Sequence, residues 1–271
     1  MILDTIAQAT RVRVDKVKSK LPLPKLKEML YEEDKLRNIN GREVFAFEQA
    51  LKKSKEFDNK AEMAFICEVK KASPSKGVIT EEFEYLSIAK EYESAGASVI
   101  SVLTEPDFFR GSDIYLSEIS KTVTIPVLRK DFTIDEYQIY EAKLIGADAV
   151  LLICSLLDED TIKEYLKLCG ELGLSALVEA HDETEVRSAL KAGARIIGVN
   201  NRNLKTFEVD LSNSIRLSEL IPEDVIYVAE SGIRTNQDIR ALAKAGVDAV
   251  LIGETLMRSS DKKQQLDALR Q

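Results

Sequence analysis

The chain has 271 residues, of which 45% are hydrophobic and 31% are charged. This balance supports a sizeable core under a charged surface and excludes a disordered or fibrous protein. The formal net charge of −8 argues against a general binder of nucleic acid or of anionic membranes, because both are polyanions, although a local basic pocket can still hold a small anion.

The first 60 residues differ from the rest and read as helices. Apolar residues at helical spacing predict two or three helices, roughly over residues 2–19, 25–36 and 43–54. In the third helix Val44, Phe47 and Leu51 share one face, which makes that face apolar. Charges are mixed throughout the first 20 residues, so this segment lacks the apolar stretch of a signal peptide. We expect residues 1–60 to form an N-terminal helical extension.

Eight short apolar runs alternate with longer helical segments from Ala64 onward. The runs are AFICEV, SVISVL, IPVLRK, DAVLLIC, SALVEA, RIIGVN, VIYVAE and DAVLIG. They are continuous rather than alternating, which is typical of parallel strands covered on both faces. The longest clean apolar run, Ala149–Cys154, is far shorter than the ~20 residues of a membrane-spanning helix. We therefore expect no membrane among the partners.

A repeated glycine pattern supports one fold for these runs. The pattern small-Gly-(Ala/Val) precedes four of them, at Gly96, Gly146, Gly193 and Gly246. A glycine at a helix end takes the left-handed cap conformation and turns the chain into the next strand. Eight βα units in ~200 residues are the number that a (β/α)₈ barrel needs. We predict an α/β protein, a single TIM barrel domain over residues 1–271. An open doubly wound sheet is the alternative, disfavoured because no G-x-G-x-x-G follows the first strand.

Polar residues follow the predicted strands at their carboxyl ends. The period of two places Glu68 and Lys70 on one face with Ile66, and Lys130 on one face with Leu128. Later strand ends carry Glu179, Asn200, Arg202, Glu230, Ser231 and Glu254. The active site of such a barrel lies at the carboxyl ends of its strands. A ring of mixed charge there predicts a functional site, with a purely structural network of ion pairs as the alternative.

Glycines and hydroxyls after the strands indicate an anion site. Ser231-Gly232 precedes a helix expected near Thr235, and Gly253 precedes the last expected helix. Glycines allow the backbone to approach a ligand, and helix N-termini present free N–H groups. The segment from Ser73 to Gly77 adds hydroxyls and a cation, or is an exposed turn. In the loops after the second and third strands, Phe108, Phe109 and Phe132 line an aromatic pocket or simply cover the barrel.

Thiols and imidazoles are scarce. The three cysteines, Cys67, Cys154 and Cys169, form no C-x-x-C pair, so we expect reduced thiols in a cytoplasmic protein. The single histidine, His181, makes a histidine-based metal site improbable and is expected to be a loop or helix-start residue.

The residues at the strand ends form recognisable motifs. They are EVKKASPSKG at 68–77, LTEP at 103–106, LRKDF at 128–132, LVE at 177–179, GVNNR at 198–202, AESGI at 229–233 and LIGE at 251–254. Over nearly the whole chain these motifs and the N-terminal helices resemble indole-3-glycerol phosphate synthase of tryptophan biosynthesis.

The resemblance implies an enzyme, a carboxy-lyase without cofactor or metal. Its substrate would be 1-(2-carboxyphenylamino)-1-deoxyribulose 5-phosphate, which it would convert to indole-3-glycerol phosphate by ring closure, decarboxylation and dehydration. The catalytic residues would be Glu68, Lys70, Lys130, Glu179, Asn200 and Ser231. The substrate-binding residues would be Ser73, Phe109, Phe132, Arg202 and Glu230. The phosphate-binding residues would be Ser231, Gly232, Gly253 and Glu254.

The implied partner is a small phosphorylated substrate, with the chain a monomer or weak homo-oligomer. One alternative is another phosphate-handling barrel enzyme, such as an isomerase, which shares the glycine site but need not combine Glu68, Lys70, Lys130 and Glu179. The other is a phosphate-metabolite sensor, which would bind tightly without turnover.

Overall fold

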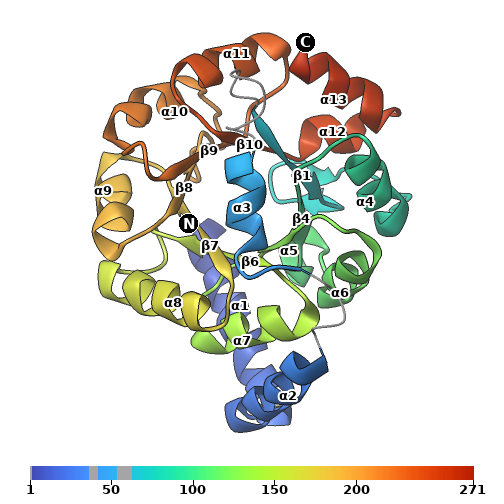
Figure 1. Cartoon of the computed structure of the whole chain (residues 1–271), viewed down its shortest axis with the longest axis vertical. Helices are drawn as coiled ribbons and strands as arrows, with labels where there is room; N and C mark the ends of the chain where they lie inside the picture. The colour runs from blue at the N-terminus through green and yellow to red at the C-terminus, as the bar shows by residue number, and fades with distance from the viewer. Residues whose placement is uncertain (1, 37–41, 54–62) are drawn as a thin grey trace.

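Eight parallel strands close into a barrel with a ring of helices around it in the computed structural model (Figure 1). The structure describes residues 2–36, 42–53 and 63–271. The strands are β1 (Ala64–Val69), β4 (Val99–Leu103), β5 (Val127–Lys130), β6 (Ala149–Ile153), β7 (Ser175–Ala180), β8 (Ile196–Asn200), β9 (Ile226–Glu230) and β10 (Ala249–Ile252). Because β1 pairs with both β4 and β10, the predicted TIM barrel is confirmed and the open sheet is excluded.

Helices cover the outer face of every strand. The outer ring consists of α4 (Tyr85–Ser94), α6 (Asp113–Thr122), α7 (Glu136–Ile145), α8 (Glu159–Glu171), α9 (Glu183–Ala192), α10 (Ser212–Leu217) with a 3₁₀ turn over Ser218–Leu220, α11 (Asn236–Lys244) and α13 (Lys262–Arg270). Loops after the strands carry two short helices, α5 (Pro106–Phe109) and α12 (Glu254–Arg258), and a hairpin of β2 (Ala72–Ser73) and β3 (Gly77–Val78). The four repeat glycines have φ of 86°, 98°, 90° and 81°, so the predicted left-handed turns are confirmed.

The strands bury side chains on both faces, which explains their continuous apolar runs. Ile66, Leu128 and Leu177 pack inside the barrel, whereas Phe65 and Cys67 belong to the layer between strands and helices. Successive residues of a strand point to opposite faces. Polar residues two positions beyond the interior ones therefore face the interior at its carboxyl end, and this alternation positions the site.

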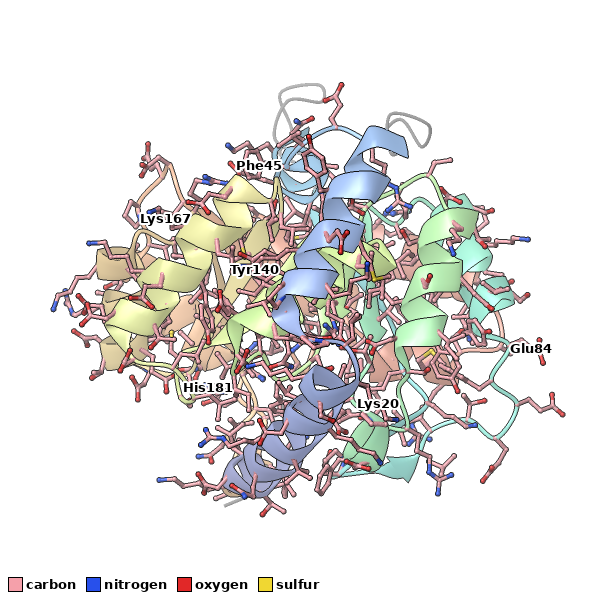
Figure 2. The ribbon with its side chains drawn as sticks, turned by 90° about the horizontal axis from the view of Figure 1, so that it is seen from below. Lys20, Phe45, Glu84, Tyr140, Lys167 and His181 are labelled. Carbon is pink, nitrogen blue, oxygen red and sulfur yellow. The ribbon has the colours of Figure 1, made fainter. Side chains whose placement is uncertain are left out.

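The N-terminal helices reach both ends of the barrel. They are α1 (Ile2–Lys20), α2 (Leu23–Leu36) and α3 (Ala46–Lys53). Phe47 and Leu51 of α3 are fully buried in the interior cluster, and α3 lies over the barrel centre in Figure 1. Helix α1 lies at the other end, and α2 crosses the side between them (Figure 2).

The third helix differs from its prediction at its start. It begins at Ala46 rather than 43, because Phe45 has a left-handed φ of 60° and donates its N–H to the Gly173 carbonyl at 3.3 Å. Val44 therefore lies outside the helix and is 60% exposed. The predicted helix end at 54 and the extension boundary at 60 lie outside the described residues. None of the described helices is long and apolar enough to cross a membrane.

Candidate active site

A cavity of about 500 Å³ opens at the carboxyl ends of the strands. The structure brings every predicted site residue to its wall. They are Glu68, Lys70, Ser73, Phe109, Lys130, Phe132, Glu179, Asn200, Arg202, Glu230, Ser231, Gly232, Gly253 and Glu254. The polar strand residues lie two positions beyond residues that face the barrel interior. Because side chains alternate along a strand, these polar residues face the interior as well.

Lys130 is the central cation of the cavity. It ends β5, and its Nζ lies 2.9 Å from Glu179 Oε2 and 3.5 Å from Glu230 Oε2. Burial by itself lowers the pKa of Lys130, but the negative charges of Glu179, Glu230 and Glu68 outweigh it and raise that pKa above its usual range. The side chain is 14% exposed, so this ammonium is both charged and accessible to a ligand in the cavity.

Glu179 is held in its ionised form. Burial favours the neutral acid, but Lys130 and His181 nearby lower the pKa of Glu179 to about 2. Asn200, which ends β8, donates its Nδ2 to Glu179 Oε1 at 3.1 Å. Its own Oδ1 accepts the N–H of Arg202 at 3.0 Å. Asn200 thus orients the carboxylate of Glu179 and also fixes the backbone at Arg202.

Glu230 contrasts with Glu179. Burial, together with repulsion from Glu179 and Glu68, raises the pKa of Glu230 to about 8 despite the attraction of Lys130. Among the described residues its Oε1 has no hydrogen-bond partner although it is buried. A Cβ on Gly198 would overlap this oxygen, so the glycine in β8 provides the room for the carboxyl group. Gly198 belongs to the GVNNR motif, but the sequence gives it no role, since the carboxyl group that it accommodates lies on another strand.

Glu68 and Lys70 form a second ion pair beside Lys130. The Lys70 Nζ donates to Glu68 Oε1, and the Lys70 side chain is 17% exposed. A Cβ on Gly253 would overlap Glu68 Oε1 and lie 2.9 Å from Lys70 Nζ. The missing side chain of Gly253 therefore leaves room for the Glu68–Lys70 ion pair, and it also allows a ligand to approach the backbone at this position.

The loops after β9 and β10 suit an anion. Ser231 and Gly232 have left-handed φ of 67° and 86°. Within the described residues the backbone N–H groups of Gly232 and Gly253 donate no hydrogen bond. Arg234 and Arg258 line the cavity beside these loops. Helix α11 begins after Thr235 as expected, but Gly253 precedes the short α12 and not the last helix, because a separate turn precedes α13.

Two aromatic rings and helix α1 supply the apolar wall. The rings of Phe109 and Phe132 lie 6.0 Å apart. Phe108 and Phe109 belong to α5 rather than to a loop, because Glu105 accepts the N–H groups at the start of this turn. Ile2, Leu3 and Ile6 of α1 also line the cavity, which periodicity in the sequence did not indicate.

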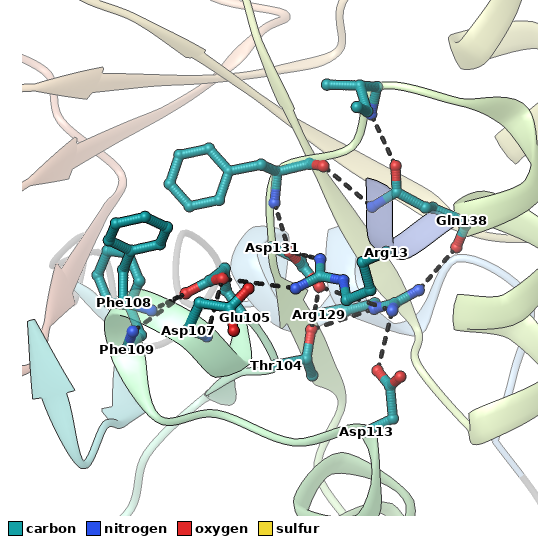
Figure 3. Close-up of polar contacts among 12 residues, drawn as sticks. Arg13, Thr104, Glu105, Asp107, Phe108, Phe109, Asp113, Arg129, Asp131 and Gln138 are labelled. Carbon is teal, nitrogen blue, oxygen red and sulfur yellow. Dashed lines mark hydrogen bonds and ion pairs between the residues drawn. The ribbon is translucent and has the colours of Figure 1, made fainter. Parts of the chain in front are cut away.

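A buried ion network fastens α1 over the cavity (Figure 3). Arg13 of α1 lies 2.8 Å from Asp131 Oδ1 and 3.5 Å from Glu105 Oε1. Thr104 donates its hydroxyl to Asp131 Oδ2 at 2.7 Å. Because Asp131 follows Lys130 and Glu105 begins α5, one arginine connects the N-terminal helix to two walls of the cavity.

His181 lies behind Glu179 rather than in the cavity wall. It precedes α9, as the sequence predicted, but its Nε2 is 3.4 Å from Glu179 Oε1. Its Nδ1 is 3.0 Å from Glu185 Oε2. Only the fold reveals this contact. Among the described residues no group of three or more His, Cys, Asp and Glu side chains is arranged to hold a metal ion.

Comparisons with known proteins agree with this geometry. The family model described as indole-3-glycerol phosphate synthase matches residues 3–269. A protein of that name from Ruminiclostridium cellulolyticum is 62% identical over 270 residues, covering 100% of this chain and 99% of the relative. Another from Endomicrobium trichonymphae is 54% identical and covers 100% of both chains. The structure of 3-hexulose-6-phosphate synthase from Salmonella typhimurium matches with a TM-score of 0.62 at 18% identity, over 77% of this chain and 97% of that one, and shows the fold alone.

Proposed function

The chain belongs to the indole-3-glycerol phosphate synthase family, and on this premise we propose which side chains perform its reaction. The enzyme is a carboxy-lyase of tryptophan biosynthesis. It closes the pyrrole ring of 1-(2-carboxyphenylamino)-1-deoxyribulose 5-phosphate and removes CO₂ and water to give indole-3-glycerol phosphate. The observation that carries the assignment of roles is the buried ammonium of Lys130 between Glu179 and Glu230.

Ring closure needs an acid at the substrate carbonyl. The aromatic carbon that bears the carboxylate attacks the carbonyl carbon, and the carbonyl oxygen gains a proton. Lys130 is the general acid for this step, because its ammonium is partly exposed to the cavity and its pKa is raised, which keeps it protonated. The C–C bond to the carboxylate then breaks, and its electron pair restores the aromatic ring as CO₂ leaves.

Dehydration needs both an acid and a base. The new hydroxyl leaves as water, and the carbon next to nitrogen loses its proton. Glu179 is the acid–base group for these transfers, because it is ionised, 2.9 Å from Lys130 Nζ and oriented by Asn200. Glu68 adds negative charge beside Lys130, and Glu230 supplies a neutral carboxyl that can donate a hydrogen bond to substrate.

The cations and free N–H groups bind the two charged ends of the substrate. Lys70, Ser73 and Arg202 bind anionic groups at the cavity wall. Ser231, Gly232, Gly253 and Glu254 hold the phosphate, the last three mainly through backbone N–H groups. Phe109 and Phe132 contact the aromatic ring of the substrate.

The test is turnover. The purified chain is incubated with the carboxyphenylamino substrate and with a panel of other aminodeoxyribulose phosphates, and indole fluorescence is recorded. We expect the fluorescence of indole-3-glycerol phosphate only with the carboxyphenylamino substrate. Turnover of another sugar phosphate would favour an isomerase, and tight binding without product would favour a sensor.

Ser231→Ala tests the phosphate site. This variant should raise KM and weaken competitive inhibition by inorganic phosphate, whereas unchanged inhibition would place the phosphate near Lys70 and Ser73.

We also propose a single domain that works in the cytoplasm as a monomer or weak homo-oligomer. Cys67 and Cys169 are buried, unpaired thiols, which suit a reducing compartment.

A further inference from the structure

His181 presents a buried nitrogen to the acid–base group from outside the cavity. Its side chain is 15% exposed, and its Nε2 has no hydrogen-bond partner among the described residues. This nitrogen lies 3.4 Å from Glu179 Oε1, close enough for an ion pair although the two atoms form no hydrogen bond. The opposite oxygen of Glu179 accepts from Lys130. Glu179 therefore stands between an ammonium on the cavity side and an imidazole on the side away from it.

The outer side of His181 is held by a second carboxylate. Glu185 Oε2 lies 3.0 Å from Nδ1 and accepts the backbone N–H of His181 at 2.7 Å. Ser155 donates its hydroxyl to Glu185 Oε1 at 2.5 Å. Asn213 of α10 donates to the His181 carbonyl at 3.0 Å. These contacts fix the ring, and the Glu185 side chain is 20% exposed, so this end of the chain of groups reaches solvent.

The reaction of the proposed function consumes one proton per turnover. Ring closure adds one proton to the carbonyl oxygen, and dehydration adds a second as that oxygen leaves as water. Loss of CO₂ from a carboxylate leaves its electron pair on the ring and supplies no proton. One proton returns from the carbon next to nitrogen. The balance is two protons given and one recovered, so each catalytic cycle takes up one proton from solution, and a group other than Lys130 has to give the second proton if Lys130 has not yet been reprotonated.

We propose that His181 provides this proton through Glu179, as a positioning and proton-relay residue. After Lys130 has protonated the carbonyl oxygen, His181 passes its Nε2 proton to Glu179, which delivers it to the departing hydroxyl. Glu179, ionised again, takes the ring proton and returns it to Lys130. His181 regains its proton from solvent at the Glu185 side. Every atom and charge is then restored, and the proposal rests on the proposed function of Lys130 and Glu179.

The charges around His181 favour its protonated form. Glu179 of β7 lies 3.4 Å from its Nε2 and Glu185 of α9 lies 3.0 Å from its Nδ1, and Glu230 of β9 adds a smaller effect where it is ionised. Burial lowers the pKa of His181, but these carboxylates outweigh it and raise that pKa above its ordinary value. Of the other neighbours, Cys154 stays neutral because burial raises its pKa to about 12, and Arg216 is bound to Asn213 on the outer side. Loss of the imidazolium proton with rising pH should therefore slow dehydration.

The experiment measures the loss of CO₂ and the loss of water separately. Enzyme in excess is mixed rapidly with substrate, so that each molecule turns over once, and CO₂ release and indole fluorescence are followed in parallel. In His181→Gln, we expect CO₂ release to stay within about threefold of the parent, while indole formation slows by ~10²-fold or more, the usual yield of a lost general acid. A decarboxylated hydroxy intermediate should accumulate. Arg187→Gln, an exposed change on the same helix that removes a pair with Glu183, should leave both rates unchanged.

Equal slowing of both rates would overturn the relay, because it would mean that His181 only shapes Glu179. Unchanged indole formation would also overturn it. Glu185→Gln keeps the imidazole and removes one carboxylate charge, so the fall in indole formation with rising pH should begin at lower pH; an unmoved profile counts against the relay. If the parent itself released no CO₂ and formed no indole, the proposed function would fail and not the relay alone.

Discussion

Two clusters of buried charge lie on opposite faces of strand β5. Arg129 points outward, where its guanidinium donates to Thr104, the Gln138 carbonyl, Asp113 and Glu141. Lys130, the next residue, points inward to Glu179 and Glu230. The outward cluster contains Thr104, Asp113, Arg129, Asp131, Gln138 and Glu141, and the inward cluster contains Glu68, Lys70, Lys130, Glu179 and Glu230.

The two clusters differ in how completely their polar groups are paired. Each of the three guanidinium nitrogens of Arg129 donates to an acceptor in the protein, four hydrogen bonds together, so the outward cluster needs no ligand. In the inward cluster Glu230 Oε1 is buried without a hydrogen bond in the described structure, and the pKa values of Glu179 and Glu230 are displaced in opposite directions. Burial of an imperfectly paired charge is costly. Complete pairing is typical of charges that stabilise the fold, whereas incomplete pairing leaves groups that a bound substrate can satisfy.

Lys130→Ala should produce the largest effect, and it should fall on catalysis. We expect kcat to drop by roughly 10²–10⁴, the usual contribution of a general acid, while circular dichroism stays that of a folded barrel. Indole fluorescence measures the rate. A variant whose kcat is within threefold of the parent would show that Lys130 is not the general acid. The functional difference between Lys130 and Arg129 would then not hold.

Arg129→Met should act on stability instead. Removing this guanidinium takes away the cation that Asp113 and Glu141 share and leaves Asp131 with Arg13, and removing one partner from a largely buried ion network costs about 3–5 kcal/mol. Urea unfolding should show this loss, and kcat of the protein that remains folded should stay within a few-fold of the parent. Equal stability would show that the outward cluster does not hold the fold.

Glu230→Gln should raise stability while lowering activity. In the unfolded chain Glu230 ionises near its ordinary pKa of 4.5, whereas the folded protein keeps it protonated up to about 8. The folded state therefore binds more protons in this window, and its stability falls as pH rises from 4.5 to 8. The neutral amide should remove that loss, on the order of 2–4 kcal/mol at pH 8 and little at pH 4.5. Urea unfolding at both values is the measurement, and an equal gain at both would contradict the assignment.

Arg13→Ala should give the smallest effect, a small loss of stability together with a moderate rise of KM. Its side chain contacts Asp131 of the outward cluster, and its helix lines the cavity of the inward cluster. Asp131 keeps Arg129 as a partner, so we expect a loss of only about 1 kcal/mol. Helix α1 carries Ile2, Leu3 and Ile6 into the cavity wall, so KM should rise severalfold with kcat nearly constant. Arg11→Ala, on the same helix, is the matched control. A drop in kcat as large as that of Lys130→Ala would show that α1 acts on the chemistry directly.

The sequence by itself determined the strands and the parity of their side chains. Continuous apolar runs between helical segments are typical of strands covered on both faces, and the repeat glycines marked four of the returns of the chain. Since side chains alternate along a strand, Glu68 could be placed on one face with Ile66, and Lys130 on one face with Leu128, although runs that are apolar on both faces do not tell which face is the interior one. The family motifs added roles for these residues, and the structure places all of them around one cavity.

Only the tertiary structure decided which distant residues meet. His181 reads as a loop residue until β7, β9 and α9 converge on it, and Gly198 reads as an ordinary strand glycine until Glu230 occupies the space beside it. Arg13 gains its role because α1 returns to the carboxyl end of the barrel. Periodicity describes how one segment exposes its faces, but burial, pairing and pKa depend on the charges that other segments bring within a few ångströms.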